Sequence, residues 1–238
     1  MKSIIVIMKR EFHSFFLSPI AYIFLTLYLV LTNFLFFQGF FLAGEASMRN
    51  YFELLPWLFL LFLPAITMRS WAEERKNRTL ELLLTWPVKD SEVVFGKFFA
   101  SFSFLFLALL LSVTVPISVI LIGNPDKGIM LSSYIGALFL GGSYIAIGMT
   151  VSSLTENQIV AFIGTVVILL IGNLIGHDAV LASVPSAVAA FLASLSLESH
   201  FTSIARGVLD SRDLIFYISV IAIALFFNIQ SLESRKWE

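Results

Sequence analysis

Charged residues are scarce in this sequence. Only 13% of the 238 residues are Asp, Glu, Lys or Arg, and 58% are hydrophobic, whereas soluble domains carry about 25% charged and about 45–50% apolar residues. This deficit excludes a protein whose whole surface faces water, so the lipid bilayer has to cover much of the chain. The net charge of −1 gives no electrostatic reason to expect nucleic acid as a partner.

Metal ligands and catalytic groups are also few. The chain has no cysteine and three histidines, which excludes disulfides and thiolate metal sites, and the histidines lack the spacing of a zinc site. No Asp, Glu or His residues cluster within the apolar runs, and no Gly-x-x-x-x-Gly-Lys-Ser/Thr loop occurs that would bind ATP. We therefore expect no catalytic residue, no metal and no cofactor on this chain.

Long apolar runs are what the sequence does contain. A helix needs about 20 mostly apolar residues to cross roughly 30 Å of hydrocarbon, and none of the runs has the two-residue alternation of a membrane β-barrel. The fold class predicted is all-α, a polytopic helical membrane bundle forming one transmembrane domain over 1–238. The six predicted transmembrane helices lie at about 19–42, 51–68, 98–122, 129–154, 159–176 and 214–231.

Besides Pro19 at the start of the first run, three prolines fall within these runs. Pro56 and Pro64 predict a kinked or partly interrupted second span, and Pro116 predicts a late break in the third, because proline removes a helical hydrogen bond and clashes with the preceding turn.

The segment 177–212 leaves two topologies open. Its part 179–197 is uncharged but consists mostly of Ala, Ser and Val around Pro185, which gain little from lipid. We favour six spans with 177–212 folded on the outer side over a seven-span alternative. Eleven of the fifteen lysines and arginines lie on the side of the N-terminus and of 69–97 in either topology, so the positive-inside rule places that side in the cytoplasm. With six spans, both termini are cytoplasmic.

The N-terminal residues 1–16 alternate apolar and charged clusters, the charged one containing Lys9, Arg10 and Glu11. This pattern predicts an interfacial helix that lies flat on the membrane and grips a cytoplasmic partner. The alternative is a polar flank to the first span.

The segment 69–97, RSWAEERKNRTLELLLTWPVKDSEVVFGK, is the only long polar stretch. It predicts an amphipathic helix from Trp71 to Trp86, which ends there because the residue before a proline is biased out of the α region, and then a second helix leading into the third span. An ordinary solvated loop is the alternative. A short second loop, 152–158, carries one charge, Glu156.

Three stretches carry a family resemblance: LPAITMRSWAEERKNRTLELLLTWPV, SSLTENQIVAF and SIARGVLDSRD. With the Gly-Lys that follows the first, they resemble the ABC-2 type permeases, most closely the permease associated with gliding motility and more loosely that of nitrous-oxide reductase maturation. The resemblance covers about 15–231. One departure is Asn77-Arg78, where a glycine often precedes the threonine.

The resemblance implies a six-span half-transporter in the bacterial inner membrane, an exporter, that works as a dimer with a second copy or a related permease. Separate ABC ATPase subunits would carry ATP and Mg²⁺, and an outer-side accessory protein is a further candidate partner. In this family 69–97 contains the coupling helix. The candidate ATPase contacts are Glu73, Glu74, Arg75, Lys76, Arg78, Thr79, Glu81, Thr155, Glu156 and Asn157. An ATP-independent scaffold or a channel is the rival function.

Overall fold

The computed structural model describes the whole chain except residues 1, 44–46, 80–87 and 235–238. The described part is helical and contains no strand. Its elements are α1 (Lys2–Leu17), α2 (Pro19–Ala43), α3 (Arg49–Thr67), α4 (Arg69–Lys76), α6 (Asp90–Ser112), α7 (Thr114–Ile122), α8 (Lys127–Leu154), α9 (Gln158–Leu174), α10 (Asp178–Leu181), α11 (Ser186–Leu195), α12 (Leu197–Ala205) and α13 (Ser211–Ser234).

Several of these helices have the length and apolarity of membrane spans. Five stretches qualify, and α11 with α12 brings the number to six if this bent pair is counted as one span. The five are Pro19–Phe41, Arg49–Lys76, Asp90–Ile122, Lys127–Leu154 and Ser211–Ser234. The apolar helix α9 has 17 residues and is shorter than these. The prediction of an all-α polytopic membrane bundle is confirmed.

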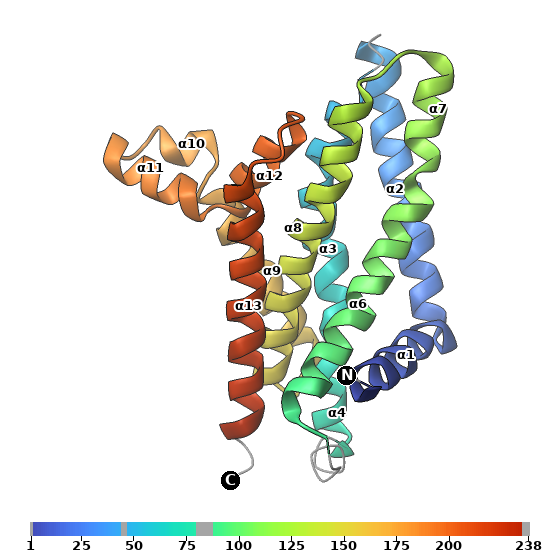
Figure 1. Ribbon diagram of the computed structural model, residues 1–238, viewed down its shortest axis with the longest axis vertical. Helices are drawn as coiled ribbons and strands as arrows, with labels where there is room; N and C mark the ends of the chain where they lie inside the picture. Colours follow the sequence, from blue (N-terminus) through green and yellow to red (C-terminus); the bar gives the residue numbers. More distant parts are fainter. Residues whose placement is uncertain (1, 44–46, 80–87, 235–238) are drawn as a thin grey trace.

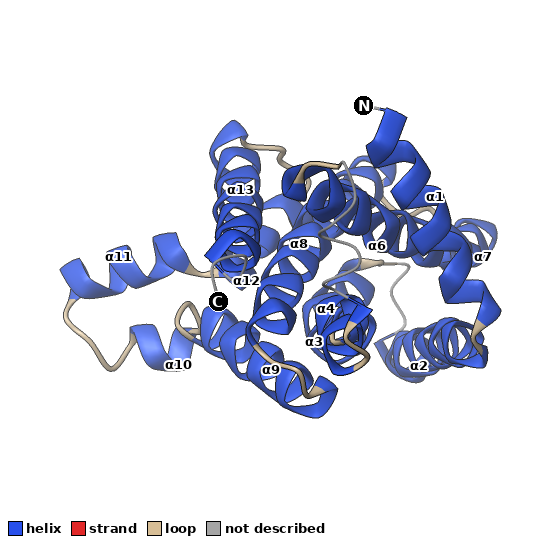
Figure 2. Cartoon of the chain, turned by 90° about the horizontal axis from the view of Figure 1, so that it is seen from below, coloured by secondary structure: helices blue, strands red, loops and turns tan. Residues whose placement is uncertain are grey.

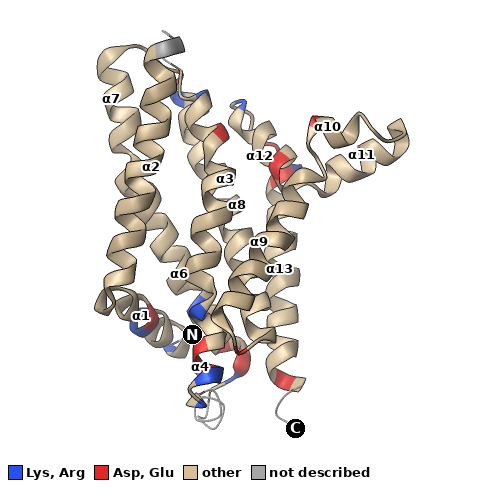
Figure 3. Ribbon diagram, turned by 180° about the vertical axis from the view of Figure 1, so that it is seen from behind, with Lys and Arg blue, Asp and Glu red and all other residues tan. Residues whose placement is uncertain are grey.

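The long helices run up and down between two ends of the molecule (Figure 1). One end, here named the α4 end, holds α1, α4 and the last turn of α13. The opposite end, named the α12 end, holds α10, α11 and α12. Charged residues gather at these two ends and leave the middle of the bundle nearly without charge (Figure 3), as a structure that crosses hydrocarbon requires.

The helix α8 forms the centre of the bundle, packed against α3, α6, α9 and α13. Glycines let its neighbours come close. A Cβ atom at Gly148 would lie 2.2 Å from Thr67 Oγ1, and one at Gly141 would lie 2.4 Å from Leu105 Cδ2. Small residues permit such close helix contacts in membranes, where packing and hydrogen bonds hold helices together.

The helix α1 lies alongside α6 at the α4 end and leads into α2 (Figures 1 and 2). Gly96 of α6 permits this contact, because a Cβ atom there would lie 2.7 Å from Ile7 Cγ2. Phe15 and Phe16 pack on Phe104, with ring centroids 5.4 and 6.0 Å apart. The predicted helix at 1–16 is therefore present as α1, and its position at a membrane interface stays a prediction.

The prolines meet the sequence-based expectation in part. The helix α3 continues through Pro56 and Pro64 without interruption, and the chain changes to α4 only at Met68, whose N–H donates to Pro64 O at 2.8 Å. The third run does break, at Val113 between α6 and α7. Pro116 explains this position, because its missing N–H leaves the carbonyl one turn earlier, at Ser112, without its helical partner.

The predicted helix from Trp71 to Trp86 is wrong in its extent, since α4 ends at Lys76. The N–H of Asn77 still donates to Glu73 O at 3.0 Å, and Arg78 then adopts a left-handed conformation with φ 56°. A residue in this conformation commonly ends a helix. The rest of that predicted helix falls in 80–87, outside the described residues.

The segment 177–212 forms three short helices. The segment 179–197 is not one continuous spanning helix, because α10 ends at Leu181 and α11 runs only from Ser186 to Leu195. The axes of α11 and α12 differ by 78°, and α11 extends sideways from the bundle (Figures 1 and 2). Gly172 of α9 and Gly176, which follows the end of α9, pack inside the subunit, since Cβ atoms there would lie close to Leu197 Cδ1 and Ser196 Oγ. The number of spans and the sides they face stay predictions.

Candidate functional site

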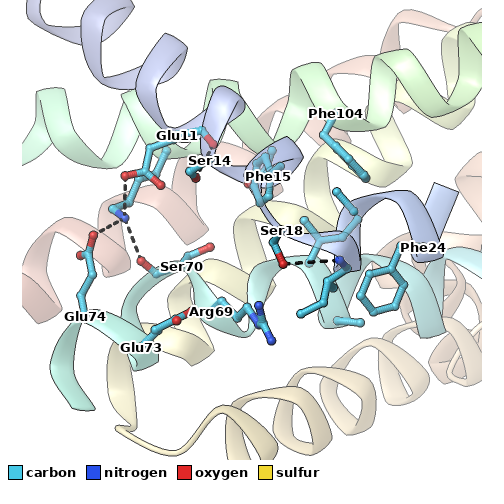
Figure 4. A pocket seen from close by; sticks show the side chains of 16 residues that line it. Glu11, Ser14, Phe15, Ser18, Phe24, Arg69, Ser70, Glu73, Glu74 and Phe104 are labelled. Carbon is cyan, nitrogen blue, oxygen red and sulfur yellow. Dashed lines mark hydrogen bonds and ion pairs between the residues drawn. The ribbon is translucent and has the colours of Figure 1, made fainter. Parts of the chain in front are cut away.

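The amine of Lys97 is the centre of a buried ionic cluster at the α4 end. Its Nζ lies 2.7 Å from Glu74 Oε1 of α4 and 3.3 Å from Glu11 Oε1 of α1. It also donates to Ser70 O at 3.0 Å and lies 4.9 Å from the centroid of the Trp71 ring. Figure 4 shows the three contacts converging on the amine. A single side chain of α6 thus joins α1 and α4.

Burial makes this cluster energetically important. The side chain of Lys97 is 4% exposed, and those of Glu74 and Glu11 are 20% and 25% exposed. Removing an ion from water costs several kcal/mol, and a partner of opposite charge with hydrogen bonds has to offset that cost. Each member of the cluster therefore depends on the others, and the arrangement of α1, α4 and α6 depends on all three.

A second junction joins the start of α4 to α8. The first N–H groups of a helix have no partner within the helix, and here those of Trp71 and Ala72 both donate to Ser152 Oγ at 3.2 Å. The same hydroxyl donates to Met68 O at 2.9 Å. Ser152 of α8, about 80 residues further along the chain, therefore caps the start of α4. The Trp71 side chain beside this junction is fully buried.

A third junction joins α4 to the connection between α8 and α9. The Arg75 guanidinium donates from Nη1 to Ser153 O at 2.8 Å, and its Nη2 lies 3.6 Å from Glu156 Oε1. The Arg75 side chain is only 8% exposed, whereas that of Glu156 is 70% exposed. These two contacts of Arg75 within the chain are here named the Arg75 clamp. They hold the exposed part of the 155–157 connection next to α4.

The predicted contact residues fall into two groups by exposure. Glu74 and Arg75 point inward and pair within the chain, as does Glu11 of α1. The residues at the surface are Lys9, Arg10, Lys76, Arg78, Thr79, Glu156 and Asn157. Glu73 and Thr155 are half-buried, and Glu81 lies outside the described residues. Asn157 also caps α9, because its Oδ1 accepts from Ile159 N at 2.9 Å.

Sequence reasoning missed Lys97 and Ser152. The signal available for Lys97 was its position directly after a glycine, at the start of a long apolar run. A charge at such a position needs a partner. Acidic residues stand in both neighbouring polar segments, Glu11 in one and Glu74 in the other. Ser152 gave no signal, since a serine at the end of a span is common.

The described residues include no candidate metal site at this end. They contain no group of three or more His, Cys, Asp or Glu side chains that could hold a metal ion. The arrangement is a short helix whose buried face is bonded to α6, α8 and the 155–157 connection and is linked to α1 through Lys97, while its last residues lie at the surface.

Comparison with known families finds one match. The ABC-2 family transporter protein model matches residues 17–229, which is most of the chain. Comparison with curated proteins finds no match for the chain.

Proposed function

The chain belongs to the ABC-2 family of transporter proteins, and from this premise we propose that it is the permease subunit of an ABC exporter driven by a separate ATPase. Members of this family are membrane components of transporters, and they associate with an ABC ATPase. The direction of transport and the site of ATPase contact are our proposals. The position of α4, bonded to the bundle on one face and exposed at its last residues, carries the proposed contact site. The direction of transport rests on the family resemblance of the sequence.

The proposed docking surface comprises Lys76, Arg78, Thr79, Glu156 and Asn157. All five are exposed, and the Arg75 clamp brings the two segments that carry them together. Both signs of charge are present, which suits a polar groove on a soluble partner, since complementary charges set register and partner choice. Glu74 and Arg75 act here as positioning residues, because their charged groups are occupied within the chain. Glu73, Thr155 and Glu81 remain candidates at the edge of this surface.

The proposed transmission follows the three junctions. When a partner pushes α4, the Lys97 cluster carries the displacement to α1 and α6, and Ser152 carries it to α8. Packed helices connected in this way move as rigid bodies and switch between discrete arrangements. The bundle would alternate between inward-open and outward-open packings, and ATP and Mg²⁺ would act on the partner subunit.

Other parts of the proposal rest on the sequence. The excess of Lys and Arg at the α4 end supports cytoplasmic termini and a bacterial inner membrane. The three motifs support a place near the gliding-motility permeases, or more loosely those of nitrous-oxide reductase maturation. A half-transporter of this kind requires a second permease copy or a related permease, and an outer-side accessory protein is a candidate partner for the α12 end. The interfacial position of Lys9 and Arg10 is part of the same proposal.

Affinity purification of the tagged chain from native membranes tests the proposal. We expect a protein with a P-loop to co-purify, and we expect the double change Lys76→Glu and Arg78→Glu to lower its recovery at least about tenfold, because like charges placed in an interface cost several kcal/mol. Lys127→Glu is the matched control, since Lys127 is exposed at the opposite end. Equal recovery with all variants would contradict the docking surface.

The rival function is an ATP-independent scaffold or a channel. It predicts that no P-loop protein co-purifies with monodisperse chain, and that charge reversal at α4 has no effect on any partner. The same purification therefore distinguishes the two functions.

A further inference from the structure

A cavity of about 330 Å³ lies beside the Lys97 cluster, between α1, α2, α3, α4 and α6. Ligand pockets in proteins have volumes of about 300–1,000 Å³, so this one has the size of a small ligand or a headgroup. Figure 4 shows its lining: the carboxylates and Arg69 lie toward α4, and Phe15, Phe24 and Phe104 lie on the other side. The cavity is therefore divided into a polar half and an apolar half.

The polar half contains opposite charges with unsatisfied atoms. Arg69 Nε and Glu74 Oε2 are both buried, and neither has a hydrogen-bond partner among the described residues. Both residues line the cavity, and the Arg69 guanidinium points toward it (Figure 4). Leaving a buried charged group without a partner is costly. A ligand with one anionic and one cationic group would satisfy both atoms.

The balance of charge excludes a purely anionic ligand. Three carboxylates line the cavity, those of Glu11, Glu73 and Glu74, against the two cations Arg69 and Lys97. Lys97 is already bonded to two of the carboxylates. An anion at Arg69 would face the remaining negative charge, whereas a zwitterion carries its own cation to Glu73 and to the unpaired oxygen of Glu74.

The apolar half continues away from the charges. A second, smaller cavity of about 20 Å³ shares Phe24, Ile66 and Phe104 with the first, and it lies between α2, α3 and α6. Its lining includes Phe62 and Leu105. The lining of the two cavities therefore changes from charged groups near α4 to apolar side chains between the spans. A phospholipid changes in the same way from its headgroup to its acyl chains.

We propose that this site binds one zwitterionic amino-phospholipid, with a phosphoethanolamine headgroup. Its phosphate accepts hydrogen bonds from Arg69, because arginine suits phosphate geometry. Its primary ammonium donates to Glu73 and to Glu74 Oε2. One acyl chain lies against Phe24, Ile66 and Phe104, and the remainder stays in the bilayer. The lipid connects α1 with α4, independently of whether an ATPase docks there.

Lipid retention tests the proposal. The full chain is reconstituted in nanodiscs with equal parts of phosphatidylethanolamine, phosphatidylglycerol and phosphatidylcholine, then transferred to mild detergent, and native mass spectrometry counts the lipids that remain. We expect one retained phosphatidylethanolamine, favoured about tenfold over phosphatidylglycerol, as one charge-assisted hydrogen bond allows. Equal retention of the three lipids, or preference for phosphatidylglycerol, overturns the proposal without any variant.

Two variants locate the site. Arg69→Gln should lower phosphatidylethanolamine retention about tenfold, and Glu73→Gln should reduce the preference over phosphatidylglycerol. Lys2→Gln is the control, because it removes the same charge from an exposed position of α1 that does not line the cavity. Circular dichroism and monodispersity confirm that the variants are folded. Wild-type retention in Arg69→Gln overturns the assignment of the headgroup to this cavity.

Discussion

The two ends of the molecule are built differently. At the α4 end, Lys97, Ser152 and Arg75 make polar contacts between elements far apart in the sequence, and their side chains are buried or nearly so. At the α12 end, α10 and α11 contain no buried residue, and Phe191 of α11 is 62% exposed. Buried polar contacts therefore brace the α4 end, whereas α11 presents apolar surface to its surroundings.

The helix α12 marks where this difference begins. It is held to α13 by Tyr217, whose hydroxyl donates to Leu197 O at 2.6 Å, and by His200 Nδ1, which lies 2.6 Å from Asp213 Oδ1. His200 also stacks on Phe216 with centroids 3.9 Å apart. Beyond these contacts the arm formed by α10 and α11 has few attachments. Its exposed apolar residues suit lipid or the outer-side accessory protein proposed above.

The largest effect is expected at the Lys97 cluster. Lys97→Met leaves two carboxylates without their cation, and breaking a buried ion pair in this way costs about 3–5 kcal/mol. Thermal unfolding of the purified chain in detergent should show a large loss of stability. Lys89→Met, at an exposed position just before α6, should change little. The double change Lys97→Met with Glu74→Gln should recover part of the loss, and no recovery would show that charge is not the cause.

The contact between α1 and α6 gives the second effect. Gly96→Ala places a methyl group 2.7 Å from Ile7 Cγ2, and such overpacking costs about 1–3 kcal/mol. The unfolding temperature of the chain should fall, and a protease should cleave within α1 more rapidly. Gly39→Ala is the control, because nothing lies within 4 Å of a Cβ atom there, and alanine favours helix over glycine. Equal behaviour of the two variants would contradict the close contact.

A smaller effect of opposite sign is expected at the end of α4. Arg78 has φ 56°, a conformation that costs a residue with a Cβ roughly 1–2 kcal/mol and costs glycine almost nothing. Arg78→Gly should therefore raise the unfolding temperature slightly, even if it weakens a docking surface. Lys76→Gly, two residues earlier and within α4, should lower it. A loss of stability in both variants would contradict the left-handed conformation.

The smallest effect is expected at the α12 end. Phe191→Ser on α11 should change the free energy of unfolding by no more than about 0.5 kcal/mol, as is usual for exposed positions. Unfolding in detergent measures it, and Phe201→Ser on α12, where the side chain is 1% exposed, is the contrasting variant. A large loss with Phe191→Ser would show that α11 is packed more tightly than its exposure indicates.

Much of the fold could be predicted from the sequence, because the cost of exposing polar backbone to lipid requires long apolar helices. The class and the long helices follow from that rule, and the helix at 1–16 follows from its alternating apolar and charged clusters. The extent of α4 could not be predicted this way. The charged and leucine-rich residues after Trp71 continue a helical pattern, and the pattern contains nothing that forces the left-handed Arg78. The family departure at Asn77-Arg78 was the relevant signal, since glycine is the usual residue in that conformation.

The candidate site shows the same limit. Composition and motif predicted a candidate site at 69–97, but they did not show which of its charged side chains face inward. Glu73, Glu74, Arg75 and Lys76 are consecutive and look alike in the sequence. Only the three-dimensional contacts show that Glu74 pairs with Lys97 and Arg75 with the connection after α8, while Lys76 lies at the surface. Pairing between distant segments is not encoded in local pattern.

Site-directed crosslinking tests the central claim most directly, and the absence of cysteine makes single-cysteine variants simple to prepare. Thr79→Cys places the crosslinker at the α4 end and Phe191→Cys places it at the α12 end, both at exposed positions. In native membranes we predict a crosslink between position 79 and a P-loop ATPase, and none from position 191. An ATPase crosslinked from 191 and not from 79 would contradict the account.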